Sequence, residues 1–275
     1  MGEFYSKPNK GAGPHIDHPD MRPLLKRCGD LHMPISIHVA EDAWMYEPAD
    51  ANNDGLINAG KWKVDMTKPG ILDHDALVNT LEYAVKNNPG TLFIACHLAN
   101  CCSNLDRLGR LFDLYPNLYA EMAARFGEIA PIPRKTKSFI EKYANRIVYG
   151  TDMGTSKNMY QTTFRILESA DEHFYEKELF NYHWPLHGLE LSDKTLKKVY
   201  NVAVGESYSV NYLFNACKKH LGSDFEATYR EPRAGDIRNS LADVSLAKEL
   251  LDYMPTKKFE VGLTETIEYF KNKYK

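Results

Sequence analysis

Three side chains that can bind metals or move protons each follow a short apolar run. The run PISIH ends in His38, TLFIACH ends in His97, and the aspartate of RIVYGTD is Asp152. If these runs are parallel strands of a barrel, their carboxyl ends converge on one face, so residues more than fifty positions apart can meet. Imidazole and carboxylate donors suit a divalent metal, which can acidify a bound water or polarise a substrate oxygen. The alternative is that each is a buried polar residue satisfied within the fold.

Alternating strands and helices are predicted to position these residues between about 34 and 150. Short apolar runs predict strands at Pro34 to Val39, Thr91 to Cys96, Leu118 to Glu121 and Arg146 to Tyr149. Amphipathic periodicity predicts helices at Asp73 to Lys86, Leu105 to Leu114 and Lys135 to Tyr143. Each strand after the first follows one helix, which is typical of β/α units around a parallel sheet.

Four sequence blocks carry a resemblance to a known family. In order they are PISIHVAEDAW, FIACHLANC, YPNLYAEMAARFGE and IVYGTDMG. Through them, residues 14 to about 198 resemble the amidohydrolase-related family of metal-dependent hydrolases and decarboxylases. The resemblance implies an α/β fold, a partial (β/α)8 TIM-type barrel lacking its early strands. It also implies that His38 and Asp152 bind the metal, and that His97 acts in acid/base chemistry or as a further ligand.

The chain departs from the family pattern at its start. The family's first strand carries a His-x-His or Glu-x-His pair, and we expect that this chain begins too late to contain it. His15 and His18 are the nearest equivalent, but their spacing is one residue too long and they follow a Gly/Pro-rich loop. Loop histidines or substrate contacts are the alternative for them. Catalytic zinc sites usually have three protein ligands, so we expect a weakly held ion, zinc or alternatively manganese, and impaired activity.

Further substrate contacts are expected at Glu121, Trp44 and Tyr46. Glu121 ends a predicted strand and could bind substrate or orient a ligand, or it could simply be a polar strand end. Trp44 and Tyr46 lie in the long insertion Glu41 to Pro69, which we expect to form a lid or substrate wall. They either pack within that wall or contact the substrate directly.

Two other groups could be mistaken for sites. His183 and His187 have i, i+4 spacing, but Pro185 would break the helix needed to bring them together, so we do not expect a zinc site there. Cys101 and Cys102 are adjacent and point in divergent directions. The five cysteines are odd in number and lack paired metal spacing, so we expect free thiols.

The pattern of expected elements changes at the C-terminal segment, residues 199–275, which follows two helices. A helix is expected from about Asn158 to Glu176 and a short one from Ser192 to Lys198. The strand VYNVAV follows, with helices at about Ser209 to His220, Ser245 to Leu251 and Glu260 to Lys273. The strings VYNVAVGESYSVNYLF and PRAGDIRNSLADVSLAKELLDYMPTKKFEVGLTETIEYF resemble NAD-dependent nucleotide-sugar epimerases of the extended short-chain dehydrogenase/reductase family. The two resemblances meet at KKVYN, which predicts a boundary between residues 198 and 199.

The epimerase resemblance implies that Arg233 contacts the diphosphate of a UDP-sugar, for which an arginine fork is suited. The chain has no G-x-x-G-x-x-G turn after an N-terminal strand, so NAD is not an expected cofactor. A metal-dependent hydrolase or decarboxylase acting on a small organic acid, amide or ester is the leading hypothesis. A residual UDP-sugar-binding segment and a non-functional chimera are the alternatives.

Charge and hydropathy limit the partners. The chain has 34 basic and 37 acidic residues, a net charge of −3, and lacks long like-charge blocks, so nucleic acid is not expected. A signal pattern and a membrane-length apolar run are both absent, so we expect a cytoplasmic protein without a membrane partner. A small-molecule substrate is expected. Because an incomplete barrel leaves strand edges unpaired and PISIHV exposed, a homo-oligomer is also expected.

Overall fold

The computed structural model describes residues 4–5, 14–154, 156–199, 208–229 and 257–273 of the 275-residue chain. The chain divides into two compact units, residues 1–201 and 202–275. The boundary lies three residues beyond the predicted one. The strands and the predicted site residues His38, His97 and Asp152 belong to the first unit.

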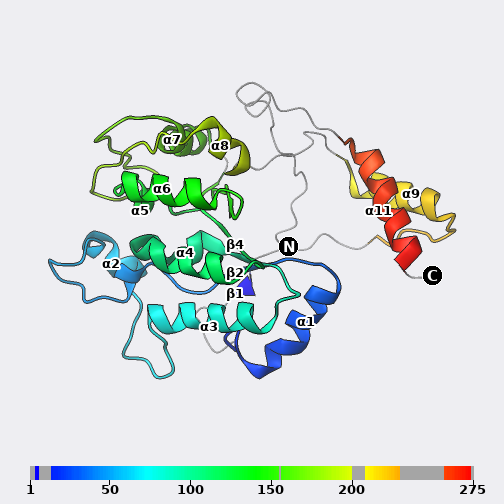
Figure 1. The fold of residues 1–275 in the computed structure, drawn as a ribbon, viewed down its shortest axis with the longest axis horizontal. Coiled ribbons are helices and arrows are strands. Elements are labelled where there is room, and N and C mark those ends of the chain that lie inside the picture. The colour runs from blue at the N-terminus through cyan, green and yellow to red at the C-terminus, as the bar shows by residue number, and fades with distance from the viewer. Residues whose placement is uncertain (1–3, 6–13, 155, 200–207, 230–256, 274–275) are drawn as a thin grey trace. The chain divides into compact units, whose positions relative to one another are not determined.

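A parallel sheet forms the centre of the first unit (Figure 1). Its strands, in spatial and chain order, are β1 Phe4–Tyr5, β2 Ile35–His38, β3 Phe93–Ala95, β4 Leu118–Glu121 and β5 Ile147–Val148. Ile37 lies opposite Ala95, which lies opposite Ala120, and all three are fully buried. The four predicted strands are confirmed as β2 to β5, and the α/β class with a parallel sheet is correct.

Helices connect and cover the strands. They are α1 Arg22–Asp30, α2 Leu56–Trp62, α3 His74–Asn87, α4 Leu105–Leu114, α5 Phe126–Ile129, α6 Pro133–Tyr143, α7 Lys157–Glu168 and α8 Asp193–Val199. Side-chain caps fix several starts: Asp73 accepts from the backbone of α3, Asn104 from α4 and Ser156 from α7. The predicted helices at α3, α4, α6 and α8 are confirmed. Sequence analysis missed α1, although Pro23 in its first turn and buried Leu25 are typical helix signals.

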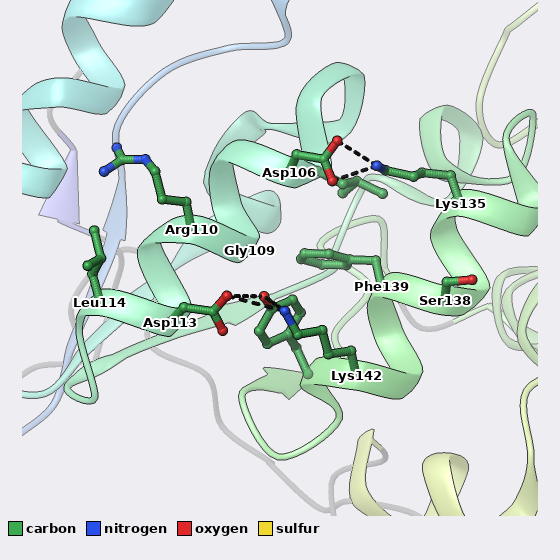
Figure 2. Close-up of a pocket in the computed structure, with 11 residues that line it drawn as sticks. Asp106, Gly109, Arg110, Asp113, Leu114, Lys135, Ser138, Phe139 and Lys142 are labelled. Carbon is green, nitrogen blue, oxygen red and sulfur yellow. Dashed lines mark hydrogen bonds and ion pairs between the residues drawn. The ribbon is translucent and has the colours of Figure 1, made fainter.

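Helices α4 and α6 pack together on the outside of the sheet, and a glycine permits their close approach. A Cβ atom at Gly109 would lie 3.0 Å from the hydroxyl of Tyr143. Figure 2 shows Asp106 paired with Lys135 and Asp113 paired with Lys142 across a hollow of about 470 Å³. Exposed pairs of this kind contribute at most about 1 kcal/mol each. This hollow contains none of the predicted site residues.

One helix is shorter than predicted. The sequence predicts a helix from Asn158 to Glu176, but α7 ends at Glu168. Ser169 is extended, and Phe174 pairs with Leu186 through reciprocal backbone hydrogen bonds of 3.0 and 2.7 Å. The antiparallel bridge provides the backbone groups of Phe174 with partners that a continued helix would otherwise supply.

The expectation that the interior side chains of PISIHV are exposed is wrong. Ile37 and Val39 are fully buried, and Ile35 is 8% exposed. Strand β1 pairs in parallel with β2, matching Phe4 with Ile37. A strand of two residues carries almost no sequence signal, which explains why it was not predicted.

The two edges of the sheet bear on the oligomeric state. Strands β1 and β5 are the terminal strands of the sheet, and terminal strands can pair with another chain. We propose that the chain self-associates, and we expect analytical ultracentrifugation at micromolar concentration to give a homodimer or larger assembly. A 31.4 kDa monomer that unfolds cooperatively would contradict this expectation.

In the second unit, helices α9 Val210–Leu221 and α11 Phe259–Lys273 contact one another. Ser209 caps α9, and Tyr208 stacks on Phe259 with ring centroids 4.2 Å apart. These two predicted helices are confirmed. Val199 is the last residue of α8, while the rest of the predicted strand VYNVAV and the predicted helix Ser245 to Leu251 lie outside the described residues. In the described part of the chain, every helix is too short or too polar to cross a membrane.

Candidate functional site

Two histidines meet where β2 and β3 end. The Nε2 atom of His97 lies 3.1 Å from the Nδ1 atom of His38, and the rings are edge to face with centroids 4.4 Å apart. Their side chains are only 2% and 5% exposed. Fifty-nine residues separate them in sequence, so the parallel strands bring them together as predicted.

Two carboxylates approach this histidine pair, one from the loop after β5 and one from the loop that continues from His38. The Oδ2 atom of Asp152, beyond β5, lies 3.8 Å from Nε2 of His97. The Oε2 atom of Glu41 lies 3.5 Å from Nε2 of His38. The side chain of Asp152 is 57% exposed, whereas that of Glu41 is 13% exposed. The site is therefore a buried imidazole pair with one solvent-exposed carboxylate.

The surroundings of His97 determine where its proton lies. Its Nδ1 atom is 2.8 Å from the carbonyl oxygen of Ala123. A carbonyl can only accept, so Nδ1 must carry the hydrogen. In the neutral ring Nε2 then has the lone pair, and Nδ1 of His38 donates into it. Asp152 approaches the same Nε2 atom at 3.8 Å, so Nε2 is the nitrogen of His97 that could take up a proton or bind a cation in place of the hydrogen that His38 donates.

Glu121 bridges the loops after β3 and β4. One carboxylate oxygen accepts from the backbone N–H of His97 at 2.7 Å, and the other accepts from that of Ala123 at 2.5 Å. The loop that carries His97 and the carbonyl that fixes its ring are thus held by one side chain. This geometry favours the orienting alternative over direct substrate binding.

Backbone strain is concentrated at this end of the sheet. Of the ten described non-glycine residues with positive φ, six lie in the loops after β3, β4 and β5: His97, Leu98, Ala99, Asn100, Ala124 and Asp152. A left-handed conformation costs an L-residue about 1 to 2 kcal/mol. Strained residues persist only where surrounding contacts hold them, and they cluster at functional sites. The strained residues therefore lie at the carboxyl ends of the strands, where the sequence predicts the site.

The donor types suit a divalent cation, but their arrangement fits it only in part. Imidazole nitrogens and a carboxylate are typical ligands of zinc and of manganese. Among the described residues, however, no three His, Cys, Asp or Glu side chains are placed to hold one ion. The hydrogen bond between His38 and His97 also occupies the lone pair of one nitrogen. Metal binding by His38 and Asp152 remains a prediction.

The aromatic residues of the insertion pack within it. Adding a Cβ atom to Gly55 would place it 2.0 Å from the indole ring of Trp44, so that ring lies directly on the Gly55 backbone. The hydroxyl of Tyr46 accepts the N–H of Glu41 at 3.0 Å, and burial raises the pKa of Tyr46. These contacts favour packing within the wall for both side chains. Tyr46 also fixes the backbone of Glu41, whose carboxylate lies beside His38.

A buried polar network around Arg125 was not predicted from the sequence. Arg125 donates from Nε to Oδ1 of Asn100 at 2.8 Å and pairs with Asp42 at 3.2 Å and Glu128 at 3.5 Å. Tyr182 donates to Glu128. The signal that could have revealed this network is the occurrence of Arg and Glu within the apolar stretch EMAARFGEIA, where an unpaired charge would be costly.

The remaining candidates do not join the site. His18 caps the turn Pro19–Met21, accepting from the N–H of Asp20, while His187 accepts from the backbone of His173. All five cysteines are free, as expected, and burial raises the pKa of Cys101 to about 12. Arg233 lies outside the described residues.

Comparisons of sequence give a partial relationship. No family model matches the chain. Part of it is similar to UDP-glucose 4-epimerase of Mycolicibacterium smegmatis, with 34% identity over 74 residues, which is 27% of this chain and 24% of the relative. The similarity to UDP-glucose 4-epimerase of Caenorhabditis elegans is 37% over 68 residues, covering 25% and 18%. The chain spans about a quarter or less of the length of these curated relatives.

Comparisons of structure give remote likenesses to two enzyme folds. A 2,6-dihydroxybenzoate decarboxylase from Rhizobium is 16% identical with a TM-score of 0.35, covering 58% of this chain and 53% of that one. A dihydroxybenzoic acid decarboxylase from a Polaromonas species, with bound manganese, is 15% identical with a TM-score of 0.34, covering 64% and 55%. A UDP-glucose 4-epimerase from Thermotoga maritima has a TM-score of 0.31 at 16% identity, covering 97% and 98%. Likenesses this weak do not identify a family.

Proposed function

We propose that the first unit is part of a TIM-type barrel site for metal-dependent hydrolysis or decarboxylation of a small organic acid, amide or ester. The observation that carries the proposal is the meeting of His97 with His38 at 3.1 Å and with Asp152 at 3.8 Å beyond the carboxyl ends of parallel strands. In barrels built from β/α units, the chemistry occurs on this face.

The residues have separate roles in this proposal. His38 and Asp152 are the ligands of the cation, which when bound would acidify a water or polarise a substrate oxygen. His97 moves the proton, because Ala123 holds its Nδ1 hydrogen, while its Nε2 atom accepts from His38 and lies 3.8 Å from Asp152. An imidazole suits this task since its ordinary pKa lies near operating pH.

Calorimetric titration with Zn²⁺ and Mn²⁺ tests the ligand assignment. We expect the wild-type chain to bind one ion and the His38→Ala, Asp152→Ala double variant to lose that binding, because both donors are removed. Asp152→Asn alone should weaken binding without affecting folding, since the side chain is 57% exposed and asparagine tolerates the positive φ of this residue.

The matched control replaces the same two residue types elsewhere. His18 and Asp20 form an exposed pair at 3.5 Å, and His18→Ala with Asp20→Ala should leave binding intact. Tryptophan fluorescence confirms folding of the first unit, because Trp44, Trp62 and Trp184 all belong to it. Undiminished binding in a folded His38, Asp152 double variant would refute the assignment.

A second candidate function rests on the sequence similarity to UDP-glucose 4-epimerases. In this reading the C-terminal segment retains UDP-sugar binding through Arg233 without transferring a hydride. Calorimetric titration with UDP tests it: binding that is lost in Arg233→Ala supports it, whereas no heat of binding leaves the segment without a nucleotide role.

A further inference from the structure

The turn after β3 has an unusual handedness. His97, Leu98, Ala99 and Asn100 have φ values of 58°, 53°, 53° and 53°. None of the four is glycine, and each is at most 2% exposed. Each residue is held in a conformation that L-amino acids disfavour. The contacts at the ends of this left-handed turn must therefore keep it from relaxing.

Glu121 holds the first residue of the left-handed turn, and Asn100 holds the last. The Nδ2 group of Asn100 donates to the carbonyl of Ala40 at 2.7 Å, and its Oδ1 accepts from Nε of Arg125 at 2.8 Å. Its own carbonyl lies 2.7 Å from Nε2 of His74, which must be the donor. The completely buried Asn100 is thus tied to three separate segments.

The side chain of Asn100 has two partners, the carbonyl of Ala40 and Nε of Arg125, and both belong to loops that fix the imidazole of His97. Ala40 lies two residues after His38, which donates to Nε2 of that imidazole. Arg125 lies two residues after the carbonyl that accepts from its Nδ1. Asn100 therefore sets the distance between the two loops that form hydrogen bonds with the imidazole of His97.

Arg125 is itself immobilised. Its NH1 group donates to the carbonyl of Ala124 at 2.9 Å and lies 3.2 Å from Asp42. The side chain is only 8% exposed. Because the guanidinium is rigid and planar, these contacts fix the direction in which Nε points toward Asn100.

We propose that Asn100 and Arg125 are positioning residues that hold His97 in the tautomer protonated on Nδ1, leaving its Nε2 atom, which lies beside Asp152, to accept from His38. If the turn relaxes, Nδ1 leaves the carbonyl of Ala123 and the hydrogen bond that favours this tautomer is lost. The importance of this tautomer for catalysis rests on the proposed function. The tautomer itself can be measured without turnover.

The test is a two-bond ¹H–¹⁵N correlation spectrum of the chain labelled with ¹⁵N-histidine, recorded at one neutral pH with a chelator present so that no metal selects the tautomer. The His97 signals are assigned by their loss in His97→Asn. Asn100→Gly removes both side-chain contacts but keeps a residue that adopts the left-handed backbone freely. Arg125→Lys keeps the positive charge beside Asp42 but loses the Nε donor.

Wild type should give the pattern of a ring protonated on Nδ1. In Asn100→Gly and in Arg125→Lys, the two nitrogen resonances of His97 should shift toward each other as the second tautomer becomes populated. Asn104→Ala is the matched control, since Asn104 caps α4 and should lower stability without moving these signals.

An unchanged Nδ1-protonated pattern in both folded variants would overturn the proposal, as would a wild-type ring protonated on Nε2. If both variants shift the signals while metal titration and activity assays fail, the positioning role stands and the proposed function falls. The two failures are therefore distinguishable.

Discussion

Replacing His97 with asparagine is expected to lower kcat by about 10²- to 10⁴-fold, the usual contribution of a positioned acid/base group. The substitution isolates this role. Asparagine tolerates the left-handed backbone that His97 adopts at φ 58°, and its amide can still donate to the carbonyl of Ala123. What it lacks is a nitrogen that can be protonated near neutral pH.

The measurement is steady-state kinetics on any benzoate or ester probe that the wild-type chain turns over in the presence of Zn²⁺ or Mn²⁺. Metal content should remain nearly unchanged. His183→Asn is the control, because His183 is exposed and edge-on to Trp184. Loss of the metal in His97→Asn would move His97 into the ligand set, and unchanged kcat would remove its acid/base role.

The strands could be predicted because the information is local. The runs that became β2 to β5 are short, apolar and bounded by polar residues, and His38 and His97 follow directly from that reading. Parallel strands of such runs must bring their ends together. The meeting of the histidines is thus predictable from sequence, although a 3.1 Å contact between their nitrogens is not.

The left-handed turn could not be predicted. The sequence HLAN contains no glycine, and its two central residues, Leu98 and Ala99, have no preference for positive φ. Its conformation depends on Glu121, Ala40 and Arg125, which lie in other segments of the chain. Tertiary contacts, rather than local propensity, decide the backbone here, as they do where α7 ends early.

The buried network of Asp42, Arg125 and Glu128 was missed for a related reason. Asp42 and Arg125 are 83 residues apart, and nothing in either segment specifies its partner. Two carboxyl groups share one guanidinium, while Tyr182 and Cys102 are the other titratable groups that face Glu128. Such an arrangement has an excess of negative charge if both carboxyls ionise.

That excess of charge leads to a prediction about pH. Burial, followed by the negative charge of Asp42, raises the pKa of Glu128 to about 8, although Arg125 opposes the shift. In the unfolded chain the group titrates near its ordinary value of 4.5. Between these values the folded state binds the extra proton, so Glu128 makes the free energy of unfolding decrease as pH rises from about 4.5 to about 8. The decrease is of the order of a few kcal/mol, since each unit of separation corresponds to about 1.4 kcal/mol.

Glu128→Gln should remove this dependence, because an amide stays neutral and can donate to Asp42 as the protonated carboxyl does. Urea unfolding followed by tryptophan fluorescence at pH 5 to 9 gives the free energy of unfolding of both proteins. The difference in favour of the variant should grow as pH rises and become constant above about pH 8. Glu82→Gln is the matched control: hydrogen bonding to Arg110 lowers the pKa of Glu82, so its contribution is lost only in acid and the two curves should stay parallel over pH 5 to 9. Parallel curves for Glu128→Gln as well would mean that Glu128 is already ionised at pH 5. Glu128 would then carry no proton in the folded state, and the charge of Arg125 alone would offset both carboxylates.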